Sequence, residues 1–185
     1  MRAAIALALC AALLGACGEG APAPAGGAPE GSRSSGGPGK APRPLAELQA
    51  EENQLLDGGA AAFEARLEEL DGHPVVVNKW ASWCGPCRAE FPFFQRQAAE
   101  RGDDIAFIGV NSSDNDADAA AFLEESPVPY PSYTDPDLEV AQVFNAVAAF
   151  PTTAFYDSDG ELAYVKQGGY SDEESLVQDI ERYAR

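Results

Sequence analysis

Cys84 and Cys87 are separated by two residues, a spacing at which two thiols can close a disulfide and open it again. The thiolate, not the thiol, attacks a disulfide, so a working pair needs one cysteine with a pKa below the free value of about 8.5. If Cys84 opens a helix, the unpaired N–H groups of the first turn and the positive helix end favour its anionic form. We therefore expect Cys84 to be the nucleophile and Cys87 the resolving thiol. Pro86 suits the helix start, where its missing N–H costs little.

The residues around this pair carry a family resemblance. The segment from Trp83 to Cys87 (WCGPC) closely resembles the active-site turn of the thioredoxin superfamily, in which Trp83, Gly85 and Pro86 support the cysteines. The next segment, Arg88 to Pro92 (RAEFP), is similar to the R/K-x-E-x-P segment of the TlpA/ResA-type membrane-anchored thiol–disulfide oxidoreductases. This resemblance implies dithiol–disulfide exchange with protein substrates, a reaction that needs no cofactor.

Glu90 is expected to carry the proton that this exchange moves. In thioredoxin itself, a buried aspartate on the preceding strand accepts the proton of the inner cysteine, but the matching residue here is Asn78, which cannot titrate. The family resemblance assigns the role to Glu90, where partial burial would raise the carboxyl pKa toward useful values. The alternative is that Glu90 is an ordinary solvated helix residue.

Phe150 and Pro151, followed by two threonines, resemble the cis-proline loop of the family, which faces the CxxC pair. A cis X–Pro bond turns the chain sharply and leaves the preceding backbone free to pair with an extended substrate. Phe150 is therefore expected to contact substrate. Its bulk departs from the smaller residues common at this position, so specificity does not follow from the resemblance. The alternative is an ordinary trans turn at Pro151.

Metal and peroxide chemistry fit the sequence less well. A CxxC pair can be half of a zinc site, but the chain has no second CxxC and only one histidine, His73. Four acidic side chains between Asp114 and Glu125 follow calcium-loop spacing, yet Ala119 stands where glycine is needed, and helix capping by Ser113 or Asp114 explains them better. The Thr-x-x-Cys pocket of thiol peroxidases is missing. We expect no metal site.

Lys79 departs from the pattern, because it falls in a segment expected to be a central strand, where the family usually has an apolar aromatic residue. Burying an unpaired ammonium is costly. We expect its side chain to reach the edge of the sheet or to pair with a carboxylate. A direct electrostatic effect on the cysteines is a further hypothesis.

The elements that position these residues follow from hydrophobic periodicity. The run from Val75 to Trp80 predicts a buried strand that ends at the motif, and a helix should run from Cys84 to about Glu100. The other expected helices cover 45–56, 60–70, 117–125, 138–144 and 172–184, the last capped by Ser171, and the other expected strands cover 105–110, 152–156 and 162–166. This order is that of the α/β thioredoxin fold, a central mixed β-sheet flanked by helices on both faces.

The N-terminal segment predicts export and lipid attachment. A charged start and a short apolar run to Leu14 are typical of a secretory signal, and the run Leu14 to Cys17 resembles the bacterial lipobox. We expect residues 1–16 to be a lipoprotein signal peptide, Cys17 to be a lipid anchor, 17–44 to be a flexible Gly/Ala/Pro-rich linker, and 45–185 to be the thioredoxin-like domain. The alternative is that Cys17 is removed with an ordinary signal.

Charge narrows the class of partners. A formal net charge of -18 and an isoelectric point near 4.2 argue against nucleic acid, which needs clustered basic residues. We assign the acidity to a solvated surface. The expected partners are protein disulfide or dithiol substrates, a membrane electron donor or acceptor, and the membrane itself through the lipid anchor; we expect a monomer.

The sequence thus predicts an extracytoplasmic, membrane-anchored lipoprotein of a bacterial cell envelope with thiol–disulfide oxidoreductase activity. The Gly85–Pro86 dipeptide is that of thioredoxin, a reductant with a potential of about -270 mV, so we favour a reductase. Some family members keep apocytochrome c cysteines reduced, which makes cytochrome c maturation one expected setting. A disulfide-forming oxidase is the alternative, and a thiol peroxidase or a metal-binding module fits less well.

Overall fold

The computed structural model describes residues 41–185. The expected signal peptide 1–16, the anchor Cys17 and the linker up to residue 40 lie outside the described residues. The first helix begins at Arg43, close to the start predicted for the folded domain. Within 41–185, no helix combines the length and apolar character needed to cross a membrane.

Six helices and six strands follow one another along this part of the chain. In order they are α1 (Arg43–Gln49), β1 (Leu55–Leu56), α2 (Gly59–Glu69), β2 (Val75–Trp80), α3 (Gly85–Arg101), β3 (Ala106–Ser112), α4 (Asp116–Glu125), β4 (Ser132–Asp135), α5 (Glu139–Val143), β5 (Thr152–Tyr156), β6 (Leu162–Gln167) and α6 (Glu173–Tyr183).

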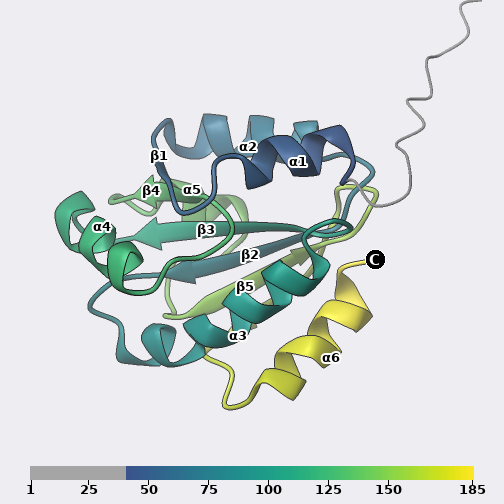
Figure 1. Ribbon diagram of the computed structural model, residues 1–185. Helices are drawn as coiled ribbons and strands as arrows, with labels where there is room; N and C mark the ends of the chain where they lie inside the picture. Colours follow the sequence, from purple (N-terminus) through teal and green to yellow (C-terminus); the bar gives the residue numbers. More distant parts are fainter. Residues whose placement is uncertain (1–40) are drawn as a thin grey trace, which may run out of the picture. The chain divides into compact units, whose positions relative to one another are not determined.

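The strands form one sheet in the order β1-β4-β3-β2-β5-β6. Strands β1, β4, β3 and β2 run parallel to one another, whereas β5 is antiparallel to β2 and β6 is antiparallel to β5. Helices α1, α2 and α5 cover one face, and α3 and α6 cover the other (Figure 1). The predicted thioredoxin fold, with a mixed sheet between two helical layers, is confirmed.

The alternation of side chains along β2 divides the core into two clusters. Val75 and Val77 contribute to the cluster beneath α1, α2 and α5, whereas Val76 and Trp80 contribute to the cluster beneath α3, α4 and α6. Successive side chains of a strand point to opposite faces, so Asn78 lies on the α3 face with Val76 and Trp80. Lys79 lies on the opposite face with the two valines.

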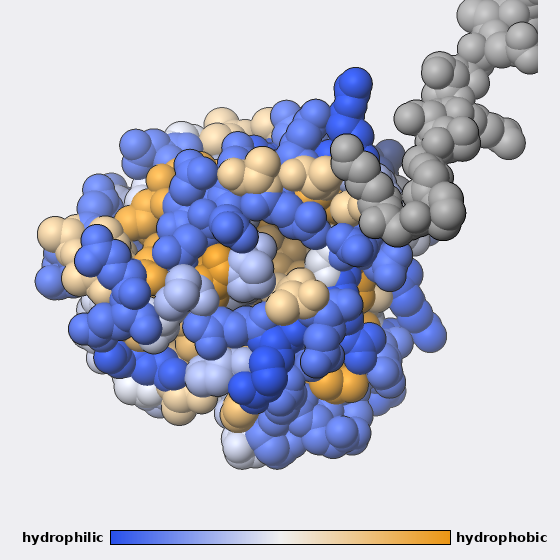
Figure 2. Space-filling view, in the orientation of Figure 1, coloured by the Kyte–Doolittle hydropathy of each residue, from blue (hydrophilic) through white to orange (hydrophobic). Residues whose placement is uncertain are grey.

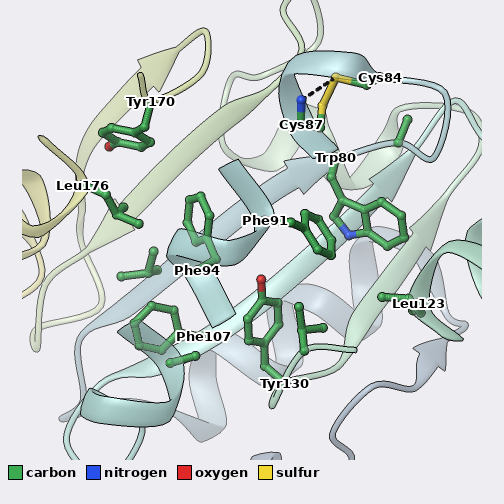
Figure 3. Close-up of a cluster of buried hydrophobic side chains, with 14 of the residues drawn as sticks. Trp80, Cys84, Cys87, Phe91, Phe94, Phe107, Leu123, Tyr130, Tyr170 and Leu176 are labelled. Carbon is green, nitrogen blue, oxygen red and sulfur yellow. Dashed lines mark hydrogen bonds between the residues drawn. A yellow bond between two sulfur atoms is a disulfide. The ribbon is translucent and has the colours of Figure 1, made fainter. Parts of the chain in front are cut away.

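The cluster on the α3 face lies directly beneath the cysteines (Figure 3). The ring of Phe91 on α3 packs edge-on against Trp80, with 5.2 Å between centroids, and against Phe122 of α4, at 4.7 Å. Such aromatic pairs contribute beyond their buried area. Gly109 of β3 leaves room for Trp80, whose indole N–H donates to Ser132 Oγ at 3.1 Å, because a Cβ at position 109 would overlap that oxygen. The strand before the cysteines is thereby fixed.

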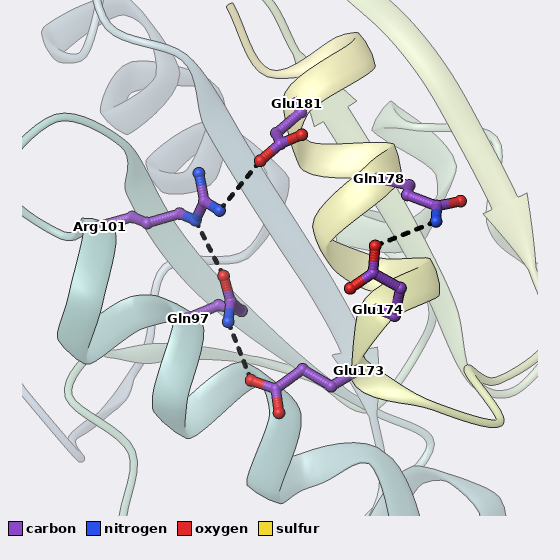
Figure 4. A network of polar contacts seen from close by, with 6 residues as sticks. All are labelled: Gln97, Arg101, Glu173, Glu174, Gln178 and Glu181. Carbon is purple, nitrogen blue, oxygen red and sulfur yellow. Dashed lines mark hydrogen bonds and ion pairs between the residues drawn. The ribbon is translucent and has the colours of Figure 1, made fainter.

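Polar contacts join α3 to α6 (Figure 4). Gln97 donates to Glu173 at 2.9 Å and accepts from Arg101, which also reaches Glu181. The N-cap of α6 is Asp172, whose side chain accepts from the N–H of Ser175; the predicted cap, Ser171, was wrong by one residue. The segment entering α6, which includes Tyr170, is thus held against α3.

Two elements differ from the sequence expectation. The helix predicted over 45–56 ends at Gln49, and the chain turns at Asn53, which has φ 60°, before forming the short strand β1. Strand β4 was not predicted at all.

The face in Figure 2 is mainly hydrophilic, with small separate apolar areas, which agrees with a solvated surface for this acidic chain.

Candidate active site

A disulfide joins Cys84 and Cys87 at the N-terminus of α3 (Figure 3). Cys84 is the N-cap residue, and its Sγ accepts a hydrogen bond from the backbone N–H of Cys87 at 3.2 Å. The same N–H can stabilise a thiolate at Cys84 after reduction, together with the positive end of the helix. Pro86 sits in the first turn, where its missing N–H is no loss.

The two sulfurs differ in access. Cys84 keeps 4% of its surface exposed, whereas Cys87 is fully buried. A partner approaching from solvent therefore meets Cys84 first. Three parts of the chain meet at the end of the sheet next to the cysteines. The parallel strands β2 and β3 both end there, and the antiparallel strand β5 begins there.

Glu90 lies one turn along α3 from Cys87, on the same helix face. Its side chain is fully buried. Oε1 accepts from the side-chain amide of Asn78 at 3.1 Å, and Oε2 accepts from the backbone N–H of Tyr170 at 2.9 Å. Burial raises the pKa of Glu90 to about 7, against the lowering effect of these two hydrogen bonds. The carboxyl group can therefore gain and lose a proton near neutral pH; the alternative of a solvated Glu90 is wrong.

Other buried polar atoms accompany this carboxyl group. Asn78 pairs across β2 and β5 with Thr153, and among residues 41–185 neither Asn78 Oδ1 nor Thr153 Oγ1 has a hydrogen-bond partner. The hydroxyl of Tyr130 is likewise buried without a partner, and burial together with the Glu90 charge raises its pKa. Buried polar atoms of this kind commonly bind an internal water.

The Phe150–Pro151 peptide bond is cis, the geometry that the family resemblance implied. The carbonyl of Pro151 accepts from the N–H of Gly168 at 2.9 Å. Gly169 lies between Pro151 and Glu90, since a Cβ at this position would be 3.4 Å from the proline ring and 3.3 Å from Glu90 Oε2. The proline loop and the buried carboxyl group thus meet at the same point.

Trp83 is the most exposed large apolar side chain of the described residues, at 59%. Its indole N–H donates to the carbonyl of Ser113 at 2.9 Å. Its ring lies 5.0 Å from that of Phe150, centroid to centroid. Two aromatic rings from segments far apart in sequence therefore stand together beside Cys84.

The structure contradicts the expectation for Lys79. Its side chain neither reaches the sheet edge nor pairs with a carboxylate; it is fully buried. The ammonium donates to the carbonyls of Ala146, at 2.5 Å, and Ala149, at 3.1 Å, and lies 3.7 Å from the centroid of the Phe150 ring. Burial lowers the pKa of Lys79 to about 8. The carbonyls satisfy a cation that would otherwise be costly to bury.

Asp114 supports the turn before Cys84, a role that the sequence did not reveal. Its carboxylate accepts from the backbone N–H of Ser82 at 2.5 Å, from the Ser82 hydroxyl at 2.9 Å and from the amide of Asn111 at 2.9 Å. Burial opposes ionisation, but these hydrogen bonds outweigh it and lower the pKa of Asp114. The N-cap of α4 is Asn115, so the predicted capping by Ser113 or Asp114 was wrong.

Metal ligands are not gathered anywhere in residues 41–185: no group of three or more His, Cys, Asp or Glu side chains could hold an ion there. Asp114 instead accepts a hydrogen bond from Asn111 in the turn before α4, and Asp116 and Asp118 lie in the first turn of α4.

Comparisons with known proteins agree with this geometry. A family model described as Redoxin matches residues 49–180. The thiol:disulfide interchange protein DsbE of Allochromatium vinosum is 33% identical over 71% of this chain and 71% of its own length. The thiol-disulfide oxidoreductase ResA of Oceanobacillus iheyensis is 32% identical over 56% of this chain.

Solved structures show the same fold. A DsbE-type thiol:disulfide interchange protein from Chlorobium tepidum is 29% identical and superposes with a TM-score of 0.58 over 63% of this chain and 83% of its own. The exposed lipoprotein thioredoxin Etrx1 of Streptococcus pneumoniae is 26% identical, with a TM-score of 0.55 over 63% and 89%.

The match spans part of some relatives, since it covers 54% of the Oceanobacillus ResA and 62% of the Bacillus subtilis ResA. The Redoxin match nevertheless covers most of this chain, and it includes the disulfide, Glu90 and the cis-proline loop. The chain belongs to the Redoxin family, and its relatives there include thiol–disulfide oxidoreductases of the ResA and DsbE types.

Proposed function

We propose that this protein is a thiol–disulfide oxidoreductase that exchanges the Cys84–Cys87 pair with protein substrates, in the reducing direction. The observation that carries the proposal is the disulfide at the N-terminus of α3, in which a backbone N–H already points at Cys84 Sγ. That arrangement stabilises a thiolate at the more accessible sulfur.

In the first step, the Cys84 thiolate attacks one sulfur of a substrate disulfide. A new bond forms between Cys84 Sγ and that sulfur, the substrate S–S bond breaks, and the second substrate sulfur leaves as a thiolate that takes up a proton. The small accessible fraction of Cys84, against none for Cys87, supports this order.

In the second step, Cys87 resolves the mixed disulfide. The Glu90 carboxylate accepts the Cys87 proton, and the resulting thiolate attacks Cys84 Sγ, which forms the Cys84–Cys87 bond and breaks the bond to the substrate. The departing substrate sulfur leaves as a thiolate and takes up a proton to become the second thiol. The pKa of Glu90, about 7, suits a group that must take up and release a proton near neutral pH. Two electrons pass to the substrate, and the protein ends as the disulfide.

The surface beside Cys84 supports protein substrates. The exposed Trp83 and the partly buried Phe150 form an aromatic rim there, and the residue before a cis-proline can pair through its backbone with an extended chain. Apocytochrome c cysteines are one substrate class that the family resemblance implies.

The reducing direction requires a dithiol donor that returns two electrons to the disulfide after each cycle, and we propose a membrane partner for this role. The Gly85–Pro86 dipeptide supports a reductant. An oxidase using the same residues would run both steps backwards.

We further propose that the protein acts outside the cytoplasm, held by a lipid on Cys17 after removal of residues 1–16 and tethered by residues 17–44. The lipobox-like sequence before Cys17 supports this, and the pneumococcal relative is itself an exposed lipoprotein. Mass spectrometry of the membrane fraction should find diacylglycerol on Cys17, and Cys17→Ser should release the protein from membranes; an unmodified, membrane-free wild type contradicts the anchor.

The activity is tested with the reduced protein and insulin. Wild type should reduce insulin disulfides, Cys84→Ser should be inactive, and Cys87→Ser should accumulate a mixed disulfide through Cys84. A redox titration should give a potential well below -150 mV, roughly in the range of thioredoxin. Absence of exchange by the wild type contradicts the oxidoreductase, and a potential above about -150 mV contradicts the reducing direction.

A further inference from the structure

Lys79 is a buried cation that the exchange steps do not use. It lies near the end of the central strand β2, paired with Val110 of β3 and Thr152 of β5. An ammonium has three N–H donors. Its neighbours are two carbonyl oxygens, of Ala146 and Ala149, and the face of the Phe150 ring. These three neighbours match the three donors, because an aromatic face also attracts a cation.

Both carbonyls belong to the loop that joins α5 to β5. They flank its exposed tip, Val147 and Ala148. Lys79 therefore holds both sides of the tip from within the sheet. Next to these contacts, the hydroxyl of Thr152 also donates to the Ala149 carbonyl, at 2.9 Å, and the N–H of Ala146 donates to Ala141.

The loop ends at Phe150, which connects Lys79 to the active site. One contact of the Phe150 ring is the Lys79 ammonium, at 3.7 Å, and another is the ring of Trp83, at 5.0 Å. Trp83 directly precedes Cys84. The position of the aromatic rim beside the disulfide is thus determined in part by the lysine.

The geometry does not favour a direct effect of the Lys79 charge on the cysteines. Lys79 shares its sheet face with Val75 and Val77, whereas α3 covers the opposite face. The Cys84 sulfur has its own donor, the Cys87 N–H. The ammonium is directed at loop carbonyls instead.

We propose that Lys79 is a positioning residue that fixes the loop 146–151 and holds Phe150 against Trp83, and thereby sets the affinity of the site for protein substrates. This inference rests on the proposed function. It separates affinity from chemistry: the lysine orders the surface that a protein substrate contacts, and it leaves the reactivity of the cysteines unchanged.

The test compares wild type with Lys79→Met, which keeps an unbranched side chain and removes the charge and all donors. Pre-reduced protein is mixed with increasing insulin, and the saturation curve gives a half-saturating concentration and a limiting rate. We expect the half-saturating concentration to rise about threefold to tenfold, because the loop must be ordered on binding. The limiting rate, the redox potential and the rate of reaction of the oxidised protein with dithiothreitol should stay at wild-type values.

Phe150→Leu tests whether Lys79 acts on substrate affinity through the Phe150 ring. Alone it should raise the half-saturating concentration, and in the Lys79→Met background it should add little, because the two side chains act as one unit. Lys166→Met is the matched control. Lys166 is the other lysine of residues 41–185; its ammonium lies 4.9 Å from the Tyr170 ring centroid and contacts neither loop carbonyl. The half-saturating insulin concentration of Lys166→Met should equal that of wild type.

Several outcomes overturn the proposal. They are an unchanged half-saturating concentration in folded Lys79→Met, a change in the redox potential or the Cys84 pKa instead, or additive effects with Phe150→Leu. If Lys79→Met does not fold by circular dichroism, Lys79→Leu replaces it, and failure of both to fold would assign Lys79 to folding and not to affinity. Absence of insulin reduction by the wild type refutes the proposed function itself.

Discussion

The side-chain amide of Asn78 donates to Glu90 Oε1 at 3.1 Å, and both side chains are buried. The other end of that amide, Oδ1, has no hydrogen-bond partner in the described part of the chain. An amide is a donor at one end and an acceptor at the other. Asn78 can therefore donate to the Glu90 carboxylate and, after the amide turns over, accept from the protonated acid. Asn78 can thus form a hydrogen bond with Glu90 both before and after Glu90 takes up a proton.

The first prediction concerns the pH dependence of exchange. Glu90 must be a carboxylate to accept the Cys87 proton, and with a pKa of about 7 its charged fraction rises from about one tenth at pH 6 to about nine tenths at pH 8. Glu90→Gln should remove the corresponding rise in the single-turnover rate of insulin reduction and lower the rate at pH 7.5 by about 10²-fold. Glu100→Gln, on the exposed end of the same helix, is the control. Identical pH profiles for Glu90→Gln and wild type would exclude Glu90 as the proton acceptor.

The second prediction concerns stability. The folded protein holds the Glu90 proton more tightly than the unfolded chain, since the pKa rises from 4.5 to about 7. The free energy of unfolding should therefore fall as pH rises through this interval, by on the order of 3 kcal/mol from this group. Glu90→Gln removes this contribution and can keep both hydrogen bonds if the Asn78 amide turns over.

Urea denaturation of the oxidised proteins at pH 4.5, 6, 7 and 8 measures this effect. The free energy of unfolding of Glu90→Gln minus that of wild type should increase steadily with pH and level off above 7. A difference that does not vary with pH would show that Glu90 has an ordinary pKa in the folded protein.

The third prediction tests the amide of Asn78. Asn78→Asp places a second carboxyl group against Glu90, and two carboxyl groups in contact tend to share one proton. At pH 8 the variant should lose about 3 kcal/mol in free energy of unfolding, and at pH 5, where the pair keeps a proton, it should lose much less. Asn145→Asp is the matched control, because Asn145 is exposed and aspartate, like asparagine, tolerates its left-handed backbone conformation. Equal losses at both pH values would refute a shared proton.

The sequence singled out those candidate site residues that lie in a local motif. Cys84, Cys87, Glu90 and Pro151 lie in short segments with a family resemblance, and the structure brings these segments together at one edge of the sheet. The buried strands with continuous apolar or β-branched runs were also predicted, because a strand covered on both faces has this pattern.

The sequence could not reveal polar groups whose partners are distant along the chain. Strand β4 is short and rich in polar residues, and it is buried because Ser132 accepts from Trp80 and Asp135 accepts from Ser112. The carbonyl partners of Lys79 likewise lie 67 and 70 residues away. No local periodicity encodes such contacts, so an isolated polar residue in an apolar strand gives no sign of what it binds.

The last prediction concerns Asp114, which holds the turn before Cys84 through the N–H and hydroxyl of Ser82. Asp114→Ala leaves these donors without their acceptor and should lower the free energy of unfolding by about 1–3 kcal/mol at pH 7. The pKa of Asp114 is lowered in the folded state from 3.8, so its contribution is present above pH 3.8 and is lost as pH falls through the lowered value. The difference in free energy of unfolding between wild type and Asp114→Ala should therefore become smaller in acid.

Amide hydrogen exchange at Ser82 gives the local measurement, because its N–H is bonded to Asp114 alone among the contacts of this turn. Protection at Ser82 should fall in Asp114→Ala and stay at the wild-type level in Asp116→Ala, which removes an exposed carboxylate in the first turn of α4. If Asp114 acts only through the general charge of the region, both variants should reduce protection at Ser82 alike. A selective loss in Asp114→Ala identifies the carboxylate as the group that orders the backbone leading to the reactive cysteine.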